Sequence, residues 1–235
     1  YIRDCLVKYG VKIPCFNLPC VVFNDELLSM SPRKKDIFRF GFVGGAEQRK
    51  NLLKVIEAFH KAFKNNKQVE LYIHSAYSPE EDYINVCQYL VNEYSKYNKI
   101  SFNLRKPVGT EEMYDLISSF DFYIFPTKIT GYFTTPCEAL SVGIPIIISD
   151  IPVHQELAKD LSQDDGIFFI RADEVDVMIH SYLGDKCLGV QFDMSVDEIA
   201  RQMTIAYSLR DTLFSEEKIE KRKSVARQYS LENLS

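Results

Sequence analysis

Residues 121–150 read DFYIFPTKITGYFTTPCEALSVGIPIIISD and have the clearest structural pattern in the chain. Two continuous apolar runs within it, 122–125 and 144–148, are rich in β-branched and aromatic residues. Such runs are typical of strands buried on both faces of a parallel sheet, and these are too short for helices. The stretch therefore predicts a strand, an open loop, a short helix and a second strand, which together form one unit of an α/β fold.

The segment between the two runs has the signals of a helix that starts close to Thr135. Threonine is a preferred N-cap, Pro136 suits the first helical position, and Glu138 fits a capping box three residues past Thr135. Gly143 ends the helix. A strand that runs through a loop with Gly131 into a helix N-terminus builds an anion site, because unpaired N–H groups and the positive end of the helix dipole point outward. We expect a phosphate there.

The 235-residue chain has the composition of an ordinary globular protein, with 46% hydrophobic and 26% charged residues. Its net charge of −5 argues against nucleic acid as a partner. No apolar run approaches the roughly 18 residues that span a bilayer, and the start has no signal-peptide pattern. We therefore expect a cytoplasmic location, or a peripheral one at the inner face of the membrane. Because the chain starts at Tyr1 rather than methionine, we expect a fragment of a longer protein.

The six cysteines are scattered, with no Cys-x-x-Cys pair and no histidine at zinc-ligand spacing. We therefore predict no metal site and expect reduced thiols. Cys137 stands near the predicted helix N-terminus, where the pKa of a thiol can fall. Since no histidine is placed in the sequence to act as its base, we expect no catalytic role for Cys137.

From residue 37 onward the chain alternates predicted strands and helices. Besides the unit above, the predicted strands are 38–43, 69–74, 100–104 and 166–170, and the predicted helices are 50–64, 80–97, 110–119, 153–159, 173–183, 195–213 and 216–229. Such alternation gives right-handed crossovers and a Rossmann-like parallel sheet with helices on both faces. We predict one domain of this class at 37–235, preceded by a segment or interdomain connection at 1–36. Ligands of such sheets bind outside the carboxyl ends of the strands.

Some charged residues are better explained by structure than by chemistry. The run 218–223 interleaves lysines with glutamates, so we expect a solvated helical face. His60 lies on an otherwise apolar helix, which favours a structural or surface role. His74 and His154 lie near strand ends on the ligand side, where we also favour a structural role.

A second site candidate follows the first strand, in the sequence FVGGAEQRKN at 42–51. Gly44 and Gly45 let backbone approach a ligand closely, and Arg49 and Lys50 bring positive charge to the carboxyl edge of the sheet. The pattern is neither Gly-x-Gly-x-x-Gly nor a Walker loop, which argues against NAD or ATP-hydrolysis chemistry. The alternative is that both cations are solvated residues of the first helical turn, although cations there oppose the helix dipole.

The two candidates together resemble the C-terminal domain of group 1 (family 4) glycosyltransferases. The matching pieces are FVG at 42–44, RKN at 49–51, IEAF at 56–59, the 121–127 strand, the Gly-Tyr-Phe loop, EALSVGIP at 138–145, SDIPVHQE at 149–156 and QYSLE at 228–232. The order and spacing of these pieces make the resemblance specific from residue 38 to about 232. The family has the GT-B architecture of two Rossmann-like domains across a cleft, of which this chain would hold the C-terminal one.

The resemblance implies a role for each matching position. Lys50 matches the lysine that holds the donor diphosphate, and Glu138 matches the second of two glutamates, which bonds the donor ribose. The residues 133–135 match the loop and helix start that face the diphosphate and sugar, and 106–108 matches a segment of the nucleobase pocket. We therefore predict Lys50, Arg49 and Glu138 as catalytic residues. The predicted donor-binding residues are Gly44, Gly45, Lys50, Pro107, Val108, Thr130, Gly131, Tyr132, Phe133, Thr134, Thr135 and Glu138.

Two positions depart from the family pattern. The first glutamate of the pair, which approaches the donor sugar, is Thr130 here, and the arginine that often follows the first strand's glycine is Gly45. Arg49 is the candidate replacement for that arginine. Loss of the glutamate implies a different sugar, altered catalysis or a homologue that binds without turnover.

By this resemblance the chain is the donor-binding domain of a retaining, metal-independent hexosyltransferase that needs no cofactor. It would transfer a sugar from a UDP- or GDP-sugar to a glycan or lipid-linked acceptor in polysaccharide biosynthesis, together with an N-terminal acceptor-binding domain. We expect the fragment alone to bind donor weakly and not to catalyse transfer. Two alternatives stay open: a non-catalytic module for binding or regulation, and a nucleotide-sugar epimerase of the same architecture.

Overall fold

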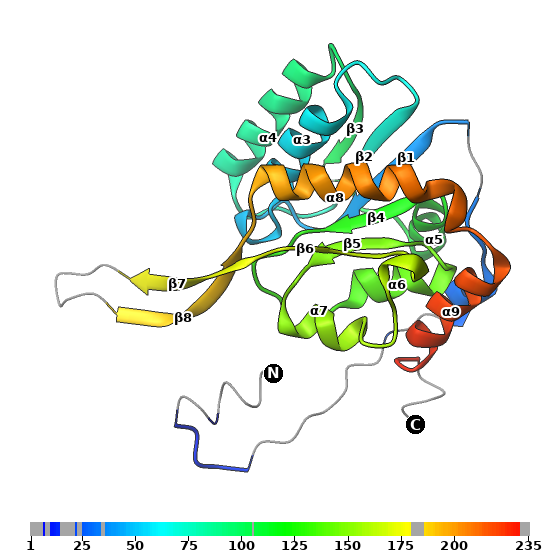
Figure 1. The fold of residues 1–235 in the computed structure, drawn as a ribbon. Helices are drawn as coiled ribbons and strands as arrows, with labels where there is room; N and C mark the ends of the chain where they lie inside the picture. The colour runs from blue at the N-terminus through cyan, green and yellow to red at the C-terminus, as the bar shows by residue number, and fades with distance from the viewer. Residues whose placement is uncertain are drawn as a thin grey trace.

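A parallel six-stranded sheet in the order β3-β2-β1-β4-β5-β6 forms the centre of the protein (Figure 1). The computed structural model describes residues 7, 10–14, 22, 25–33, 36–104, 106–179 and 186–230. The strands are β1 (Phe38–Val43), β2 (Val69–Ser75), β3 (Lys99–Leu104), β4 (Phe122–Phe125), β5 (Ile146–Ser149) and β6 (Ile167–Ile170). Strand order reverses at β1, which pairs with β2 on one side and with β4 on the other. The predicted Rossmann-like α/β class is confirmed.

Helices cover both faces of this sheet (Figure 1). One face carries α3 (Leu52–Phe63), α4 (Glu81–Tyr94) and α8 (Val196–Leu209), and the other carries α5 (Thr110–Ser118), α6 (Thr134–Val142), α7 (Pro152–Leu157) and α9 (Glu216–Arg227). Each face has its own apolar cluster. Phe42 and Phe59 belong to the first cluster, and Tyr123 and Leu140 belong to the second.

Alternate residues of β1 serve the two clusters. Phe40 and Phe42 pack in the cluster under α3, and Val43 packs in the cluster under α6. Gly41 shares the face of Val43, and a Cβ there would lie 2.2 Å from the ring of Phe120. Residues 40–43 are therefore buried on both faces of the sheet, so neither set of these side chains meets water.

The helix predicted at 173–183 is wrong. Residues Asp173–Ile179 form β7, which pairs antiparallel with β8 (Lys186–Asp193) in a hairpin that extends away from the sheet in Figure 1. Residues 174–177 alternate acidic with β-branched side chains, and this period of two favours a strand over a helix. The end of the predicted helix lies outside the described residues.

The other described elements lie close to their predicted positions, and most of the predicted connection at 1–36 lies outside the described residues. Its described part includes α2 (Asp25–Ser29), whose buried Leu27 packs in the cluster under α6. Lys223 of α9 donates hydrogen bonds to the backbone oxygens of Leu28 and Met30, at 3.0 and 2.7 Å, and so fixes this segment to the domain. None of the described helices is long and apolar enough to cross a membrane.

The solvated face predicted at 218–223 is wrong at Arg222 as well as at Lys223. The Arg222 side chain is fully buried, and its guanidinium donates to the backbone oxygens of Gly143, Asp165 and Leu213 at 2.8, 2.7 and 2.8 Å. The mixture of charges along the sequence could not reveal this, because the three acceptors come from distant turns. Arg222 is therefore a structural cation whose hydrogen-bonding capacity is used within the fold.

Replacing Arg222 with methionine should strongly destabilise the protein. Arg222→Met keeps the aliphatic stem but leaves three buried carbonyls without their donor, and each such group costs about 1–3 kcal/mol. We expect the free energy of unfolding, measured by urea denaturation, to fall by about 3 kcal/mol or more. The matched control is Arg227→Met on the same helix, where the side chain is 48% exposed, and it should lose less than about 1 kcal/mol. Equal losses in the two variants would contradict the structural role.

Candidate functional site

The loop after β1 carries the two predicted cations just before the start of α3. Arg49 and Lys50 belong to a short 3-10 helix, η1 (Gln48–Lys50), and Asn51 follows in the left-handed conformation with φ of 56°. This residue separates η1 from α3, so the prediction of a single helix from residue 50 is wrong. The cations are therefore not residues of the first turn of α3.

Gly44 and Gly45 leave room for charged side chains of the same loop. A Cβ on Gly44 would lie 3.2 Å from Lys50 Nζ, and a Cβ on Gly45 would lie 2.6 Å from Glu47 Oε1. The second distance is shorter than real Cβ contacts, so a side chain at position 45 would displace the Glu47 carboxylate. The free space above the glycines, which the sequence predicts for a ligand, thus adjoins a carboxylate and an ammonium group.

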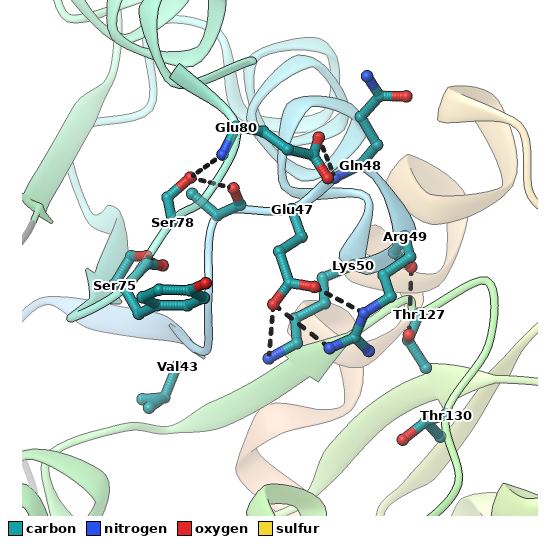
Figure 2. Close-up of polar contacts among 12 residues, drawn as sticks. Val43, Glu47, Gln48, Arg49, Lys50, Ser75, Ser78, Glu80, Thr127 and Thr130 are labelled. Carbon is teal, nitrogen blue, oxygen red and sulfur yellow. Dashed lines mark hydrogen bonds and ion pairs between the residues drawn. The ribbon is translucent and has the colours of Figure 1, made fainter. Parts of the chain in front are cut away.

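Glu47 is a site residue that the sequence analysis did not single out. Its Oε2 accepts a hydrogen bond of 2.6 Å from Arg49 Nε, and its Oε1 lies 4.0 Å from Lys50 Nζ (Figure 2). Lys50 is half-buried, and burial lowers the pKa of its ammonium group while the charge of Glu47 opposes this shift. An acidic residue two positions before a pair of cations was the signal that could have indicated this arrangement.

Hydrogen bonds join this loop to the segment that follows β4. Asn51 Nδ2 donates to the Pro126 carbonyl at 2.9 Å, and the backbone oxygen of Arg49 accepts from Thr127 Oγ1 at 3.2 Å and from the Lys128 N–H at 2.7 Å. Asn51 and Thr127 are buried, so these bonds are shielded from water. They bring the two predicted sites together at the reversal of strand order. In the same place, Lys50 Nζ lies 5.9 Å from the ring centroid of Phe125, the last residue of β4.

The N-cap of α6 is not the residue that the sequence predicts. Phe133 occupies the N-cap position without a side-chain cap, and the hydroxyl of Thr135 bonds to Tyr123 in β4 instead. The capping box predicted for Thr135 and Glu138 is therefore wrong, because the sheet engages the threonine. The N–H groups of Thr134 and Thr135 lie in the first turn of α6, where no intrahelical acceptor exists. The helix end thus keeps the donors that an anion site requires.

Glu138 lies further along α6 and is half-buried. Burial raises the pKa of its carboxyl group to about 7. Its charge contributes to the raised pKa values of Tyr123 in β4 and Tyr114 in α5, so the carboxyl lies near the side chains of these two tyrosines. Within the described part of the chain we find no hydrogen bond to this carboxyl. A desolvated carboxyl of this kind is typical of a binding site rather than of a cap.

Thr130 folds back into the loop that carries it. Its hydroxyl donates to the backbone oxygen of Tyr132 at 2.5 Å and accepts from the N–H of the same residue at 3.4 Å. Gly131 is exposed, and the ring of Tyr132 stacks on that of Phe133 with centroids 4.3 Å apart. Figure 2 shows the Thr130 side chain on the loop beyond Thr127, with no contact drawn to either cation. The hydroxyl is therefore used within the loop.

A pocket of about 300 Å³ lies beside the loop after β1 and is lined by Lys106 and Val108. His74, at the end of β2, forms part of its wall, and Pro107 is exposed next to it. His74 is 3% exposed, its Nε2 has no partner among the described residues, and burial lowers the pKa of its imidazole. The backbone oxygen of His74 accepts from the Gly44 N–H at 3.1 Å, so the pocket and the cationic loop are neighbours.

Other residues considered from the sequence are structural. His154 is fully buried with Nδ1 3.0 Å from the Ser149 oxygen, and His60 stacks on Tyr94 with centroids 3.9 Å apart. Burial raises the pKa of the Cys137 thiol to about 12, so the lowering expected at a helix N-terminus does not occur. Among the described residues no group of three side chains is arranged to hold a metal ion.

The arrangement therefore combines three chemistries along one edge of the sheet. Arg49, Lys50 and the start of α6 attract anions, Glu138 can accept hydrogen bonds from hydroxyl groups, and the mostly polar pocket near Val108 can hold a group that makes hydrogen bonds. A ligand that carries all three kinds of group in a row fits this edge.

The family model described as "Glycosyl transferases group 1" matches residues 24–179 of the chain. A lipopolysaccharide core biosynthesis mannosyltransferase of Rhizobium meliloti is 29% identical over 65 residues, which are 28% of this chain and 18% of the relative. The matched segment thus spans less than a fifth of that protein.

Two solved structures share the fold at low identity. The C-terminal domain of a glycosyl transferase group 1 family protein from Francisella tularensis superposes with a TM-score of 0.63 at 13% identity, over 87% of this chain and 98% of that one. The pneumococcal O-GlcNAc transferase, solved with UDP and GlcNAc, superposes with a TM-score of 0.64 at 14% identity, over 99% of this chain but only 40% of that one. The fold is thus that of the C-terminal half of a GT-B glycosyltransferase, as the sequence predicts. With the family match over about two thirds of its length, the chain belongs to the group 1 glycosyl transferases.

Proposed function

We propose that this chain is the donor-binding half of a retaining glycosyltransferase and that its donor is a nucleotide-diphosphate sugar, either a UDP- or a GDP-sugar. One observation carries the proposal. The loop that carries Lys50 and the segment after β4 that leads to α6 are far apart in the sequence, and the hydrogen bonds of Asn51 and Thr127 join them at the carboxyl edge of the sheet. This is the place where open α/β sheets bind their ligands.

Each part of the donor has a matching part of the site. The diphosphate would lie between Lys50, Arg49 and the N–H groups of Thr134 and Thr135, and the ribose hydroxyls would donate to Glu138. The nucleobase would occupy the pocket lined by Lys106 and Val108. The pneumococcal O-GlcNAc transferase, solved with UDP and GlcNAc, supports this proposal by its shared fold.

The proposed chemistry is electrostatic. Negative charge grows on the leaving nucleoside diphosphate during transfer, and Lys50, Arg49 and the α6 dipole would stabilise it without a metal ion. The glycan or lipid-linked acceptor, together with any general base, would come from an N-terminal domain. We therefore propose that the chain by itself binds donor without transferring the sugar.

A second candidate function is a binding module that has lost catalysis. The observation that favours it is the Thr130 hydroxyl, which bonds to the backbone of Tyr132 instead of presenting a carboxylate to a sugar. Both candidates require nucleotide binding. A transfer assay with the full-length protein separates them, because only the enzyme would release free nucleoside diphosphate when acceptor is added.

Removing the Lys50 charge should weaken donor binding. Lys50→Ala should cost about 1.5–3 kcal/mol, or roughly 10- to 150-fold in Kd, because a hydrogen bond to a charged group is lost. Isothermal titration calorimetry with UDP and GDP measures this effect. The control is Lys61→Ala on α3, where the side chain is 57% exposed and pairs with Asp197. If neither nucleotide binds the unmodified protein, the donor-binding proposal fails; if Lys50→Ala binds as well as the control, Lys50 is not part of the site.

Glu138 should make the stability of the protein depend on pH. Its pKa is about 7 in the folded protein and about 4.3 in an unfolded chain, so the folded state holds the proton more tightly. The protonated Glu138 carboxyl therefore adds to the free energy of unfolding. This contribution is fully present below pH 4.3 and is lost as pH rises through 7.

Glu138→Gln should therefore stabilise the protein relative to the unmodified chain by about 1–3 kcal/mol at pH 8 and by much less at pH 4.5. Thermal unfolding at both pH values measures the difference. Glu156→Gln, on the exposed side of α7, should show no such change with pH. If Glu138 destabilises the fold at neutral pH, a role in binding would explain why this position carries a glutamate, since function and stability often conflict at binding sites. If Glu138→Gln changed the stability by the same amount at both pH values, burial would not be what raises the pKa of Glu138.

A further inference from the structure

The Glu47 carboxylate pairs with the two cations to which the proposed donor phosphates would bind. Glu47 accepts from Arg49 Nε at 2.6 Å and from a second Arg49 nitrogen at 3.3 Å, while its Oε1 lies 4.0 Å from Lys50 Nζ. Its side chain is only 15% exposed, and that of Lys50 only 17%. Figure 2 shows both cations directed toward this one carboxylate. The carboxylate thus has the position and the charge of a bound anion.

Gly45 creates the space that the carboxylate fills. A Cβ at position 45 would lie 2.6 Å from Glu47 Oε1 and 3.3 Å from the backbone oxygen of Tyr77, so only glycine leaves this position open. The Gly45 N–H has no hydrogen-bond partner among the described residues and is half-exposed. The same space is therefore close to a free backbone donor as well as to two cations. Such surroundings suit a phosphate oxygen.

The contacts of Glu47 also allow its carboxylate to leave. The backbone of the loop is fixed independently, because the Glu47 oxygen accepts from the Lys50 N–H at 2.9 Å and Glu80 accepts from the Gln48 N–H at 3.2 Å. Within the described part of the chain, the Glu47 carboxylate hydrogen-bonds only to Arg49 and makes one further ion pair, at 4.0 Å, with Lys50. Rotation of the side chain would thus free both cations without unfolding the loop.

Charge balance shows why the carboxylate and the donor compete. Arg49 and Lys50 carry two positive charges, and Glu47 reduces their sum to one. A diphosphate diester carries two negative charges, so it is matched only after Glu47 withdraws, and a carboxylate that stayed would repel it. We propose that Glu47 is an internal competitor for the donor diphosphate, which holds Arg49 and Lys50 in the empty site and is displaced on binding. This inference rests on the proposed function and assigns the residue that limits its donor affinity.

Glu47→Gln tests the competition, because glutamine keeps the size and one acceptor oxygen but removes the charge. We expect the Kd of this variant for UDP or GDP, whichever the unmodified protein binds, to fall about tenfold. Inorganic pyrophosphate should gain by a similar factor, while uridine and guanosine, which lack phosphate, should bind as before. Calorimetric titration of the complete chain measures all three kinds of probe.

The matched control is Glu80→Gln, which removes an acidic charge that bonds the same loop without touching either cation. If removal of a negative charge acted only through the overall electrostatic potential of the loop, diphosphate binding would improve equally in Glu47→Gln and Glu80→Gln. That result would overturn the inference. An unchanged or weakened diphosphate affinity in Glu47→Gln would also overturn it, since Glu47 would then merely position Arg49. If no diphosphate binds any of these proteins, the proposed function itself fails. Thermal unfolding of Glu47→Gln checks that the variant is folded.

Discussion

Parallel pairing of β1 with both β2 and β4 positions the candidate site. It sends the loops after β1 and β4 out at the same edge, although about 80 residues separate them. Buried hydrogen bonds from Asn51 and Thr127 then fix one loop against the other. The position of the loop that carries Lys50, relative to the segment that leads to α6, is thereby set by backbone topology and by two uncharged polar side chains.

The number and kind of partners that a buried cation has indicate whether it is structural or a candidate for ligand binding. Arg222 donates to three backbone oxygens, so its capacity is used within the fold. Lys50 has burial enough to lower its pKa but only a carboxylate 4.0 Å away, which is a long contact for an ion pair. Partial satisfaction of this kind leaves a cation available for an incoming anion, whereas full satisfaction does not.

Strands of the main sheet were predicted better than the hairpin outside it. The strand at Phe122–Phe125 has its predicted bounds, because burial on both faces requires a continuous apolar run. The helix predicted at 173–183 failed because a polar hairpin outside the main sheet has only its alternation to indicate a strand. The cap predicted at Thr135 failed for a different reason, since the hydroxyl bonds to Tyr123 of a neighbouring strand rather than to its own helix.

The fold class, the family resemblance and the two site segments could be inferred from the amino-acid sequence, because these depend on spacing and composition along the chain. The partner that each charged group takes became known only from the folded structure. Glu47 turned out to hold both cations, Glu138 lost its predicted cap and became a desolvated carboxyl, and Arg222 moved from the expected surface into the interior. The physical reason is that burial and hydrogen-bond geometry depend on distances between side chains in the packed state, which no local pattern specifies.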